Sequence, residues 1–382
     1  MRIVHLSDSA LPSRDANGVN ATRMCQAFAA QGHDVALLSR DGDPAGVAAL
    51  AGGDDAFFVR YGVSACFECV RLPAPRSGVG AELRYALAAR RWLASRPAPD
   101  ILYARHLLAL AMAAPAGGRK VYEAHRPPRG AARLLMRALV RDGRLARIVA
   151  ISAALRAEIL RVVPGLDPGC VVVAHDGADP PAPPFDGGGL PQTGSESASG
   201  RLRVGYIGHL YPGKGMETVA ALARALPEVD FHVVGGRDED LARWRARTRA
   251  SANLVLHGYV PPAATDAWRA AMDVLLAPYQ QRVALRGGVG DVARWMSPLK
   301  VFEAMAAGRP IVASDLPVLR EVLRDGRESL LVAPGDLRAW VAAVEALRDP
   351  GLRKRLGEAG QARFRDHYTW SARARRVVEG LA

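Results

Sequence analysis

The chain has 382 residues, 49% of them apolar and 23% charged, so it is long enough for two domains with separate cores. Its net charge of +13 favours anionic partners such as nucleotides or acidic lipid surfaces, but no DNA- or RNA-binding signature accompanies that charge. No apolar run approaches the about 18–20 residues of a membrane helix, and the start MRIVHLSDSALP resembles a strand more than a signal peptide. We therefore expect a cytoplasmic protein.

Short apolar runs alternate with segments of helical length along the whole chain. Strands are predicted in the first half at 2–7, 34–39, 100–105, 120–125, 147–152 and 170–176. After residue 200 they are predicted at 201–208, 230–236, 253–260, 273–279, 310–315 and 329–334. Continuous apolar strands that alternate with helices predict an α/β protein with parallel sheets covered on both faces.

The only short-spaced cysteine pair is Cys66 and Cys69, which form a CxxC motif. A zinc site needs a second pair or nearby histidines, and a redox motif normally lies where a strand meets a helix. We interpret the cysteines as reduced structural thiols and expect no metal site.

A domain boundary is predicted where the sequence PPAPPFDGGGLPQTGSESASG, residues 180–200, is rich in Pro, Gly and Ser. The halves 1–182 and 201–364 each open with a strand, a Gly-containing loop and a helix, and 183–200 links them. This pattern predicts two Rossmann-like domains that face a central cleft, with ligands at the carboxyl ends of the strands. Neither half has Gly-x-Gly-x-x-Gly after its first strand, which argues against a dinucleotide cofactor.

The loop GHLYPGKG, residues 208–215, partly matches a P-loop. It has the Gly-x-x-x-x-Gly-Lys pattern after an apolar strand, but Gly215 stands where a P-loop has the Ser or Thr that binds magnesium. Among the later strands only 310–315 ends in the Asp that would support magnesium. A hydrolytic P-loop enzyme is therefore not expected, although the loop keeps the glycines and the lysine that suit a diphosphate.

A predicted anion site lies at the start of a helix in the segment 295–323. Ser297 is predicted to cap this helix and Pro298 to occupy its first position, with the end near Ala307 and Gly308. The first free N–H groups and the charge of Lys300 then attract an anion.

Glu303 lies one helical turn beyond that anion site. Its carboxylate suits hydrogen bonds from a ribose diol, and the alternative is an ordinary solvated helix residue.

The motif SPLKVFEAMAAGRPIVAS resembles the C-terminal signature of family-4 glycosyltransferases, retaining enzymes of the GT-B fold, in its Ser-Pro-Leu-Lys variant. GHLYPGKG resembles the family's phosphate loop, and NGVNATRMCQAFAAQGHDV is similar to its N-terminal Gly loop, helix and strand. FRDHYTWSARARRVVEGL is similar to the family's closing helix, expected at 365–382, which crosses back to the N-terminal domain. The resemblance covers nearly the whole chain.

The resemblance assigns roles to individual residues. His125, Lys214 and Glu303 are the implied catalytic residues: His125 would reach the transferred sugar, Lys214 would neutralise the diphosphate and Glu303 would bind the ribose. The implied donor-binding residues are Asn17, Gly18, His209, Gly213, Gly215, Tyr259, Val260, Ser297, Pro298, Leu299 and Lys300. Arg105 and Arg126 are assigned to the acceptor.

Two positions depart from the family pattern. The family usually has Arg where this chain has His209, and Arg282 or Arg286 is a candidate replacement for that charge. Many members also carry a Glu at the position of Trp295, where it contacts the donor sugar, so the identity of the sugar is open.

The resemblance implies transfer of a hexosyl group from a nucleotide-diphosphate sugar, with UDP favoured, to a hydroxyl acceptor by a retaining front-face mechanism. Preorganised Lys and helix N–H groups would stabilise the leaving diphosphate, so no metal cofactor is expected. The acceptor is a lipid-linked glycan or a small molecule, and no nucleic acid is expected. The alternatives are a sugar-nucleotide epimerase of the same fold and a non-enzymatic protein that binds anionic ligands.

Arg129, Arg133, Arg137 and Arg141 recur at four-residue spacing, which places them on one face of a predicted helix. A basic amphipathic helix suits acidic phospholipid or a lipid-linked acceptor at the inner membrane face. The alternative is a solvated amphipathic helix.

Overall fold

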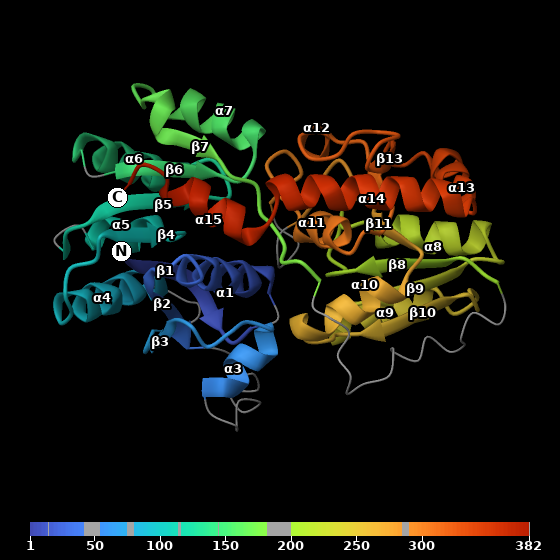
Figure 1. The fold of residues 1–382 in the computed structure, drawn as a ribbon, viewed down its shortest axis with the longest axis horizontal. Coiled ribbons are helices and arrows are strands. Elements are labelled where there is room, and N and C mark those ends of the chain that lie inside the picture. The colour runs from blue at the N-terminus through green and yellow to red at the C-terminus, as the bar shows by residue number, and fades with distance from the viewer. Residues whose placement is uncertain are drawn as a thin grey trace. The chain divides into compact units, whose positions relative to one another are not determined.

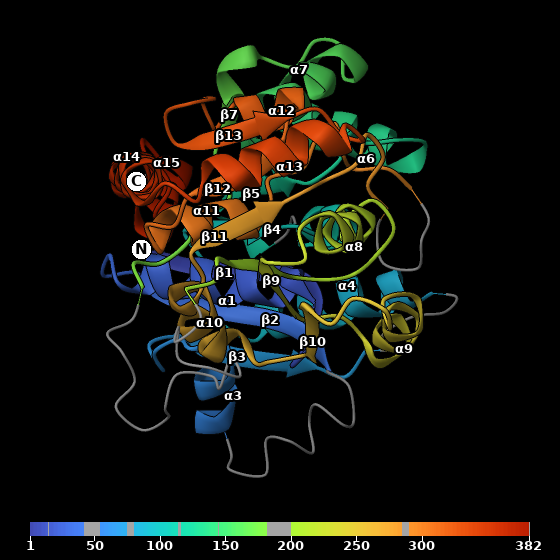
Figure 2. The same ribbon diagram turned by 90° about the vertical axis from the view of Figure 1, so that its right-hand side faces the viewer.

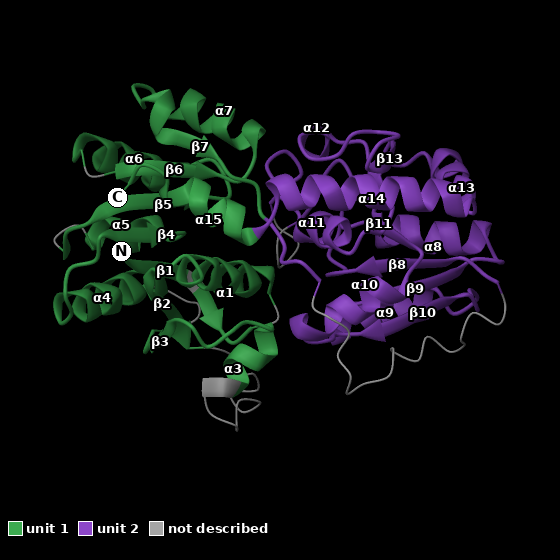
Figure 3. Cartoon of the chain, viewed as in Figure 1, with its two compact units in different colours: residues 1–176, 370–382 green, residues 177–369 purple. Residues whose placement is uncertain are grey.

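The computed structural model describes residues 1–13, 15–41, 54–74, 80–113, 116–143, 145–181, 200–284 and 290–381. The chain forms two compact units, and each is built around a parallel sheet (Figures 1 and 3). Unit 1 comprises Met1–Asp176 and Trp370–Ala382, and unit 2 comprises Gly177–Thr369. The division falls at Asp176, ahead of the predicted boundary at 182, and most of the predicted linker lies outside the described residues.

The sheet of unit 1 has the strand order β3-β2-β1-β4-β5-β6-β7, with every described pair parallel. The strands are β1 (Arg2–Leu11), β2 (Asp34–Asp41), β3 (Glu68–Leu72), β4 (Ile101–Ala104), β5 (Arg119–Ala124), β6 (Leu145–Ala150) and β7 (Val171–Val173). The strand order reverses beside β1, where Val4 lies opposite Ala36 of β2 and Leu102 of β4. Ligand sites in such sheets lie beyond the carboxyl ends of the strands at this reversal.

The helices of unit 1 include a C-terminal one that the sequence places far from the rest. They are α1 (Ala16–Ala29), α3 (Asp54–Tyr61), α4 (Ala81–Ala94), α5 (Leu107–Met112), α6 (Ala131–Arg141), α7 (Ala153–Val162) and α15 (Trp370–Val378). Helix α15 packs on α1, and Gln31 Nε2 donates to the carbonyl of Ser371 at 3.0 Å. The Arg147 guanidinium donates to the carbonyls of Arg376, Val377 and Glu379.

Unit 2 has the strand order β10-β9-β8-β11-β12-β13, again parallel. Its strands are β8 (Arg203–Ile207), β9 (Asp230–Val234), β10 (Leu254–Gly258), β11 (Val274–Ala277), β12 (Ile311–Ser314) and β13 (Ser329–Val332). Its helices are α8 (Met216–Ala225), α9 (Asp238–Arg247), α10 (Thr265–Ala271), α11 (Leu299–Ala306), α12 (Pro317–Arg320), α13 (Leu337–Ala346) and α14 (Pro350–His367).

Residues of β11 alternate between two apolar cores, as expected for a strand buried on both faces. Leu275 and Ala277 belong to the core that contains α11 and α14 residues, whereas Val274 and Leu276 belong to the core beneath α8 and α13. Figure 2 shows α8 on one side of this sheet and α11 and α14 on the other. The sheet of unit 2 is therefore covered on both faces, as the sequence predicts.

Each of the twelve predicted strand segments overlaps an observed strand, and β3 is an additional strand. Strand β3 was not predicted, because it is a short edge strand with charged, partly exposed residues and has no continuous apolar run. Cys69 lies within it and the exposed Cys66 lies just before it. Within the described ranges no disulfide links the cysteines, and no helix is long and apolar enough to cross a membrane.

The predicted closing helix at 365–382 requires a correction. Helix α14 continues to His367 within unit 2, and the segment of unit 1 begins only at Trp370. The break falls at Tyr368, whose ring packs against Phe302 of α11 at 5.1 Å between centroids. This apolar contact keeps the last turn of α14 in unit 2.

Candidate active site

The loop from Gly208 to Gly215 joins β8 to α8 and packs closely against the chain that follows β11. A Cβ atom on Gly215, which has a φ of +99°, would lie 1.9 Å from the Pro278 carbonyl oxygen. A Cβ atom on Gly213 would lie 2.0 Å from the Arg282 carbonyl oxygen. Both glycines are therefore needed for packing within unit 2, a role that the sequence pattern does not show.

Two lysine amines converge on the ring of Tyr279. Lys214 Nζ, from the loop, lies 5.3 Å from the ring centroid, and Lys300 Nζ, from α11, lies 5.0 Å from it. Lys300 Nζ also lies 3.8 Å from the centroid of Tyr206. The Lys300 amine is buried and has no hydrogen-bond partner among the residues that the structure describes. Two aromatic rings offset only part of the cost of burying an amine in this way.

This environment changes the acidity of both amines. Burial lowers the pKa of Lys214 to about 8. Burial, together with the neighbouring Lys214 charge, lowers the pKa of Lys300 well below its usual value, against a smaller opposing effect of Glu303. An anion beside the two amines would favour their charged forms and so raise the pKa of each.

The start of α11 differs by one residue from the prediction. Pro298 has an extended ψ of 116° and is the N-cap, so the helix begins at Leu299, and Ser297 is buried one residue further out. The N–H groups of Leu299 and Lys300 precede the first intrahelical hydrogen bonds. The end of the helix is as predicted, because Gly308 has a φ of +64° and its N–H donates to the Met305 carbonyl at 3.0 Å.

Glu303 of α11 is paired and is not simply solvated. Its Oε2 accepts a hydrogen bond from Arg269 Nη1 of α10 at 3.1 Å. Arg269 is buried and also donates to Thr265 Oγ1 and Asp266 Oδ1. Arg269 was not predicted as a site residue, because its partner Glu303 lies 34 residues away and no sequence pattern links the two.

Other residues near the predicted donor site make aromatic contacts. The His209 ring stacks on Tyr211 with centroids 4.8 Å apart. Tyr259 and Val260 directly follow β10, whose His257 lies against the Trp268 ring. Burial lowers the pKa of His257 to about 4.

Trp295 stands where many members of the family carry a glutamate. Its side chain is buried, and the Arg294 guanidinium lies over its ring. Arg282 is exposed, and Arg286 lies outside the described residues.

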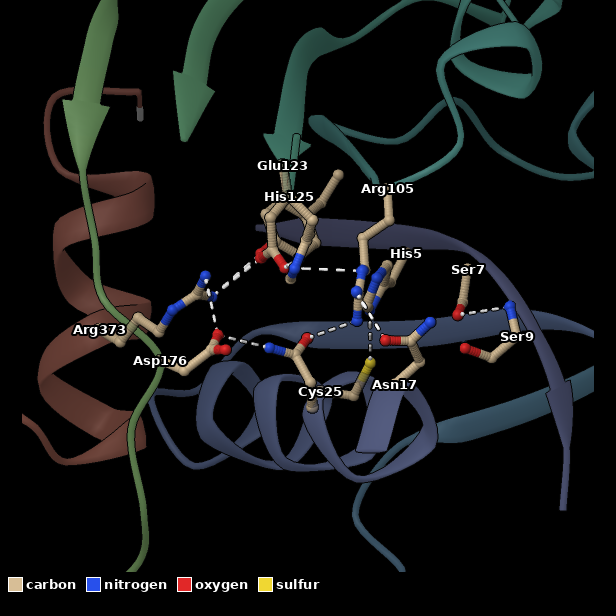
Figure 4. A network of polar contacts seen from close by, with 12 residues as sticks. His5, Ser7, Ser9, Asn17, Cys25, Arg105, Glu123, His125, Asp176 and Arg373 are labelled. Carbon is tan, nitrogen blue, oxygen red and sulfur yellow. Dashed lines mark hydrogen bonds and ion pairs between the residues drawn. The ribbon is translucent and has the colours of Figure 1, made fainter. Parts of the chain in front are cut away.

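Unit 1 has a polar network at the carboxyl ends of its strands (Figure 4). His125, after β5, is hydrogen-bonded through Nε2 to Glu123 Oε1 at 2.5 Å. Glu123 is buried, and its Oε2 accepts from Arg373 Nη1 of α15 at 2.9 Å. His125 was predicted as a site residue, and the structure places it in one network with Glu123 and Arg373, which were not predicted.

Arg105 connects this network to the start of α1. Its Nη1 and Nη2 atoms donate to Asn20 Oδ1 and Asn17 Oδ1, and its Nε lies 3.7 Å from Glu123 Oε1. Asn20 in turn donates to Asp176 at 2.8 Å. The predicted residues Arg105, Asn17 and His125 thus lie together at the strand ends.

Two further predicted residues lie near this network in the sequence. Gly18 is buried, and a Cβ atom on it would lie 2.8 Å from Tyr61 Oη. Arg126 is exposed after β5.

Comparisons with known proteins agree with this architecture. Residues 18–181 match the family described as Glycosyltransferase Family 4, and residues 201–349 match Glycosyl transferases group 1. The phosphatidyl-myo-inositol mannosyltransferase of Mycobacterium leprae is 34% identical over 176 residues, which are 44% of this chain and 42% of that protein. The alpha-maltose-1-phosphate synthase of Mycolicibacterium smegmatis is 29% identical over 248 residues, which are 61% of this chain and 62% of that protein. The chain thus matches less than two thirds of the length of either relative.

Two solved structures share the fold at low sequence identity. Anabaena HepE in complex with UDP and glucose has a TM-score of 0.70 and 16% identity, with 100% of this chain and 99% of that chain covered. Sucrose-phosphate synthase from Thermosynechococcus elongatus has a TM-score of 0.74 and 18% identity, with 98% and 97% covered.

The two parallel-sheet units and these likenesses define the GT-B class of folds. Within that class the chain belongs to glycosyltransferase family 4, with the family 4 domain in its first half and the group 1 domain in its second. The predicted family and fold are confirmed.

Proposed function

We propose that the chain is a retaining glycosyltransferase that moves a hexosyl group from a UDP-sugar to a hydroxyl acceptor without a metal. The observation that supports this most strongly is the pair of lysine amines at Tyr279, of which Lys300 Nζ is buried with no hydrogen-bond partner among the described residues. A diphosphate beside them would supply the missing acceptor and the opposite charge.

Lys300 is our candidate for the charge that the family usually places at His209. A Cβ atom on Gly208, at the head of the loop, would lie 3.3 Å from Lys300 Nζ, so this amine already occupies the space beside the loop. The exposed Arg282 is less suited, because a solvated guanidinium stabilises a phosphate less than a desolvated cation does. Glu303, held by Arg269, is assigned to the ribose.

The proposed reaction breaks the bond between the sugar C1 and the diphosphate oxygen, and that oxygen keeps the electron pair. The acceptor oxygen forms its bond to C1 on the same face, and its proton passes to the leaving phosphate. Lys214, Lys300 and the first N–H groups of α11 stabilise the charge on the diphosphate. We assign His125 to the transferred sugar, Asn17 and Gly18 to the diphosphate, and Arg105 and Arg126 to the acceptor.

The names of similar proteins support the substrates that we propose. HepE was solved with UDP-glucose, which supports a UDP-sugar donor here. The mycobacterial relative is named for a phosphatidyl-inositol, which supports a lipid-linked acceptor.

Helix α6 suits an acidic membrane surface at which a peripheral enzyme meets such an acceptor. It carries Arg133, Arg137 and Arg141, and its Leu134 side chain is 64% exposed. Arg129 precedes this helix, so three of the four arginines that were predicted to share one helical face lie in α6.

The experiment that tests this function is thermal-shift screening against UDP-, GDP-, dTDP- and ADP-sugars, followed by product analysis with candidate acceptors. A UDP-sugar at 100 times its Kd is expected to stabilise the protein by about 2.7 kcal/mol. Turnover is expected to be unchanged by EDTA. Products formed without an acceptor would identify an epimerase, and the absence of a shift with every nucleotide sugar would reject a donor site.

The affinity for UDP is expected to fall as the pH rises through about 8. The charged form of Lys214 binds the diphosphate, and its pKa of about 8 in the free protein means that this form is present below pH 8 and lost above it. Binding near pH 8 should therefore take up protons, which calorimetry in buffers of different ionisation enthalpy measures. Lys214→Arg, which stays charged, is expected to weaken this dependence. A flat affinity in wild type from about pH 7 to 9.5 would contradict the assignment.

A further inference from the structure

The side chain that completes the unit 1 network comes from the far end of the chain. Arg373 of α15 is buried, and its guanidinium donates to Glu123 Oε2 at 2.9 Å, to Tyr103 Oη at 3.2 Å and to the His175 carbonyl at 3.0 Å. It also lies 3.6 Å from Asp176. Bonds in several directions fix both the guanidinium and the carboxylate that it holds.

The fixed carboxylate determines which nitrogen of His125 is bonded. Glu123 gives one oxygen to Arg373 and the other to His125 Nε2, at 2.5 Å. An ionised carboxylate only accepts hydrogen bonds, so Nε2 must carry the proton and the neutral ring has its free lone pair on Nδ1. The half-buried ring then offers Nδ1 as an acceptor to a ligand hydroxyl.

We propose that Arg373 is a positioning residue for the active site: through Glu123 it fixes the orientation of His125 and the tautomer that leaves Nδ1 available to the substrate. The part of this proposal that concerns substrate binding by Nδ1 rests on the proposed function, whereas the tautomer of His125 is a property of the protein alone. This assigns to the C-terminal helix a part in substrate recognition in addition to its packing on α1.

The charges around Glu123 are consistent with this role. Burial alone would raise the pKa of Glu123, but Arg373, then His125 and His5, hold it at about 2, so the carboxylate is ionised at neutral pH. Among the described residues, Arg105, directly after β4, and Asp176, three residues after β7, are further charged groups that face the network. Burial raises the pKa of Asp176, and Arg373 opposes that effect. Removing Arg373 therefore leaves burial less opposed at both carboxylates and favours their protonation.

The test is the tautomer of His125, measured by two-bond ¹H–¹⁵N NMR on protein with labelled histidine. The His125 signals are those that disappear in His125→Asn. Wild type is expected to show the Nε2–H tautomer at neutral pH. Arg373→Met is expected to lose this preference, and Arg373→Lys, which keeps the charge, to retain it.

In kinetics, Arg373→Met should lower kcat by about 10- to 100-fold with little change in donor KM, and move the acid limb of the pH profile to higher pH.

The matched control is Arg375→Met, which removes an arginine from the same helix whose side chain is exposed and bonded to Ser371. It should keep the wild-type tautomer and kcat. An Nδ1–H tautomer in wild type would overturn the proposal, as would an unchanged tautomer in folded Arg373→Met or an equal loss in Arg375→Met. If Arg373→Met does not fold, an Nδ1–H tautomer in wild type or in Arg373→Lys still overturns the proposal. If no donor supports transfer but the spectra are as expected, the proposed function fails and the positioning role stands.

Discussion

Lys300→Met is expected to make the ligand-free protein more stable and its binding of UDP weaker. The Lys300 amine is buried against Tyr206 and Tyr279 without a hydrogen-bond partner among the described residues, so the native state bears a desolvation cost that the two rings offset only in part. Such a cost is about 1–3 kcal/mol by comparison with other proteins, and methionine has a similar shape without it. Thermal denaturation without ligand should show a Tm higher by several degrees.

The same substitution removes a desolvated cation from the proposed diphosphate site. Loss of one partner of a buried charge pair costs about 2 kcal/mol or more, which is at least about 30-fold in affinity. Isothermal titration with UDP measures this loss. Lys354→Met is the matched control, because Lys354 is exposed on α14 and lies 3.9 Å from Glu358. A Lys300→Met protein that binds UDP like wild type would remove Lys300 from the donor site.

Gly215→Ala is expected to damage unit 2 more than an ordinary glycine substitution does. The new Cβ would lie 1.9 Å from the Pro278 carbonyl oxygen, a rigid backbone atom, and the φ of +99° disfavours any L side chain. Backbone strain and overpacking together are expected to lower the free energy of unfolding by about 2–5 kcal/mol. The shift of the loop would also displace the adjacent Lys214, so UDP affinity should fall with stability.

Gly335→Ala separates the two causes. Gly335 has a comparable φ of +87°, but a Cβ atom there meets nothing within 4 Å. Gly335→Ala should lower the free energy of unfolding only by the cost of a positive φ at an L residue, about 1–2 kcal/mol, and UDP affinity should be unchanged. Equal Tm losses for the two variants, measured by thermal denaturation, would show that the contact with Pro278 is relieved by a small movement.

The strands and the loop between β8 and α8 were predictable because their signals are local. Apolar runs identify buried parallel strands, and the glycines beside Lys214 identify a tight loop, within windows of a few residues. The predicted start of α11 was wrong by one residue. Whether a proline is the first residue of a helix or the one before it depends on its ψ angle, which the sequence does not specify.

The residues that hold the site were not predictable in the same way. Arg269 lies 34 residues from Glu303, and Arg373 lies 250 residues from Glu123. An arginine in a chain with 51 lysines and arginines carries no mark of a partner at such a distance. Lys300 was predicted at the helix start, but its burial between two tyrosine rings depends on how β8 and β11 pack.

The return of α15 to unit 1 has a consequence for the order of folding during synthesis. Unit 2 is continuous in sequence, whereas unit 1 needs Trp370 and the residues after it as well as the first 176. Closing so long a loop is slow compared with local folding. On the ribosome, the first 176 residues of unit 1 are made long before Arg373, so Glu123 and Asp176 lack its guanidinium until the last helix has emerged. A chain that ends at Thr369 would retain all of unit 2 and still lack the guanidinium that both carboxylates share.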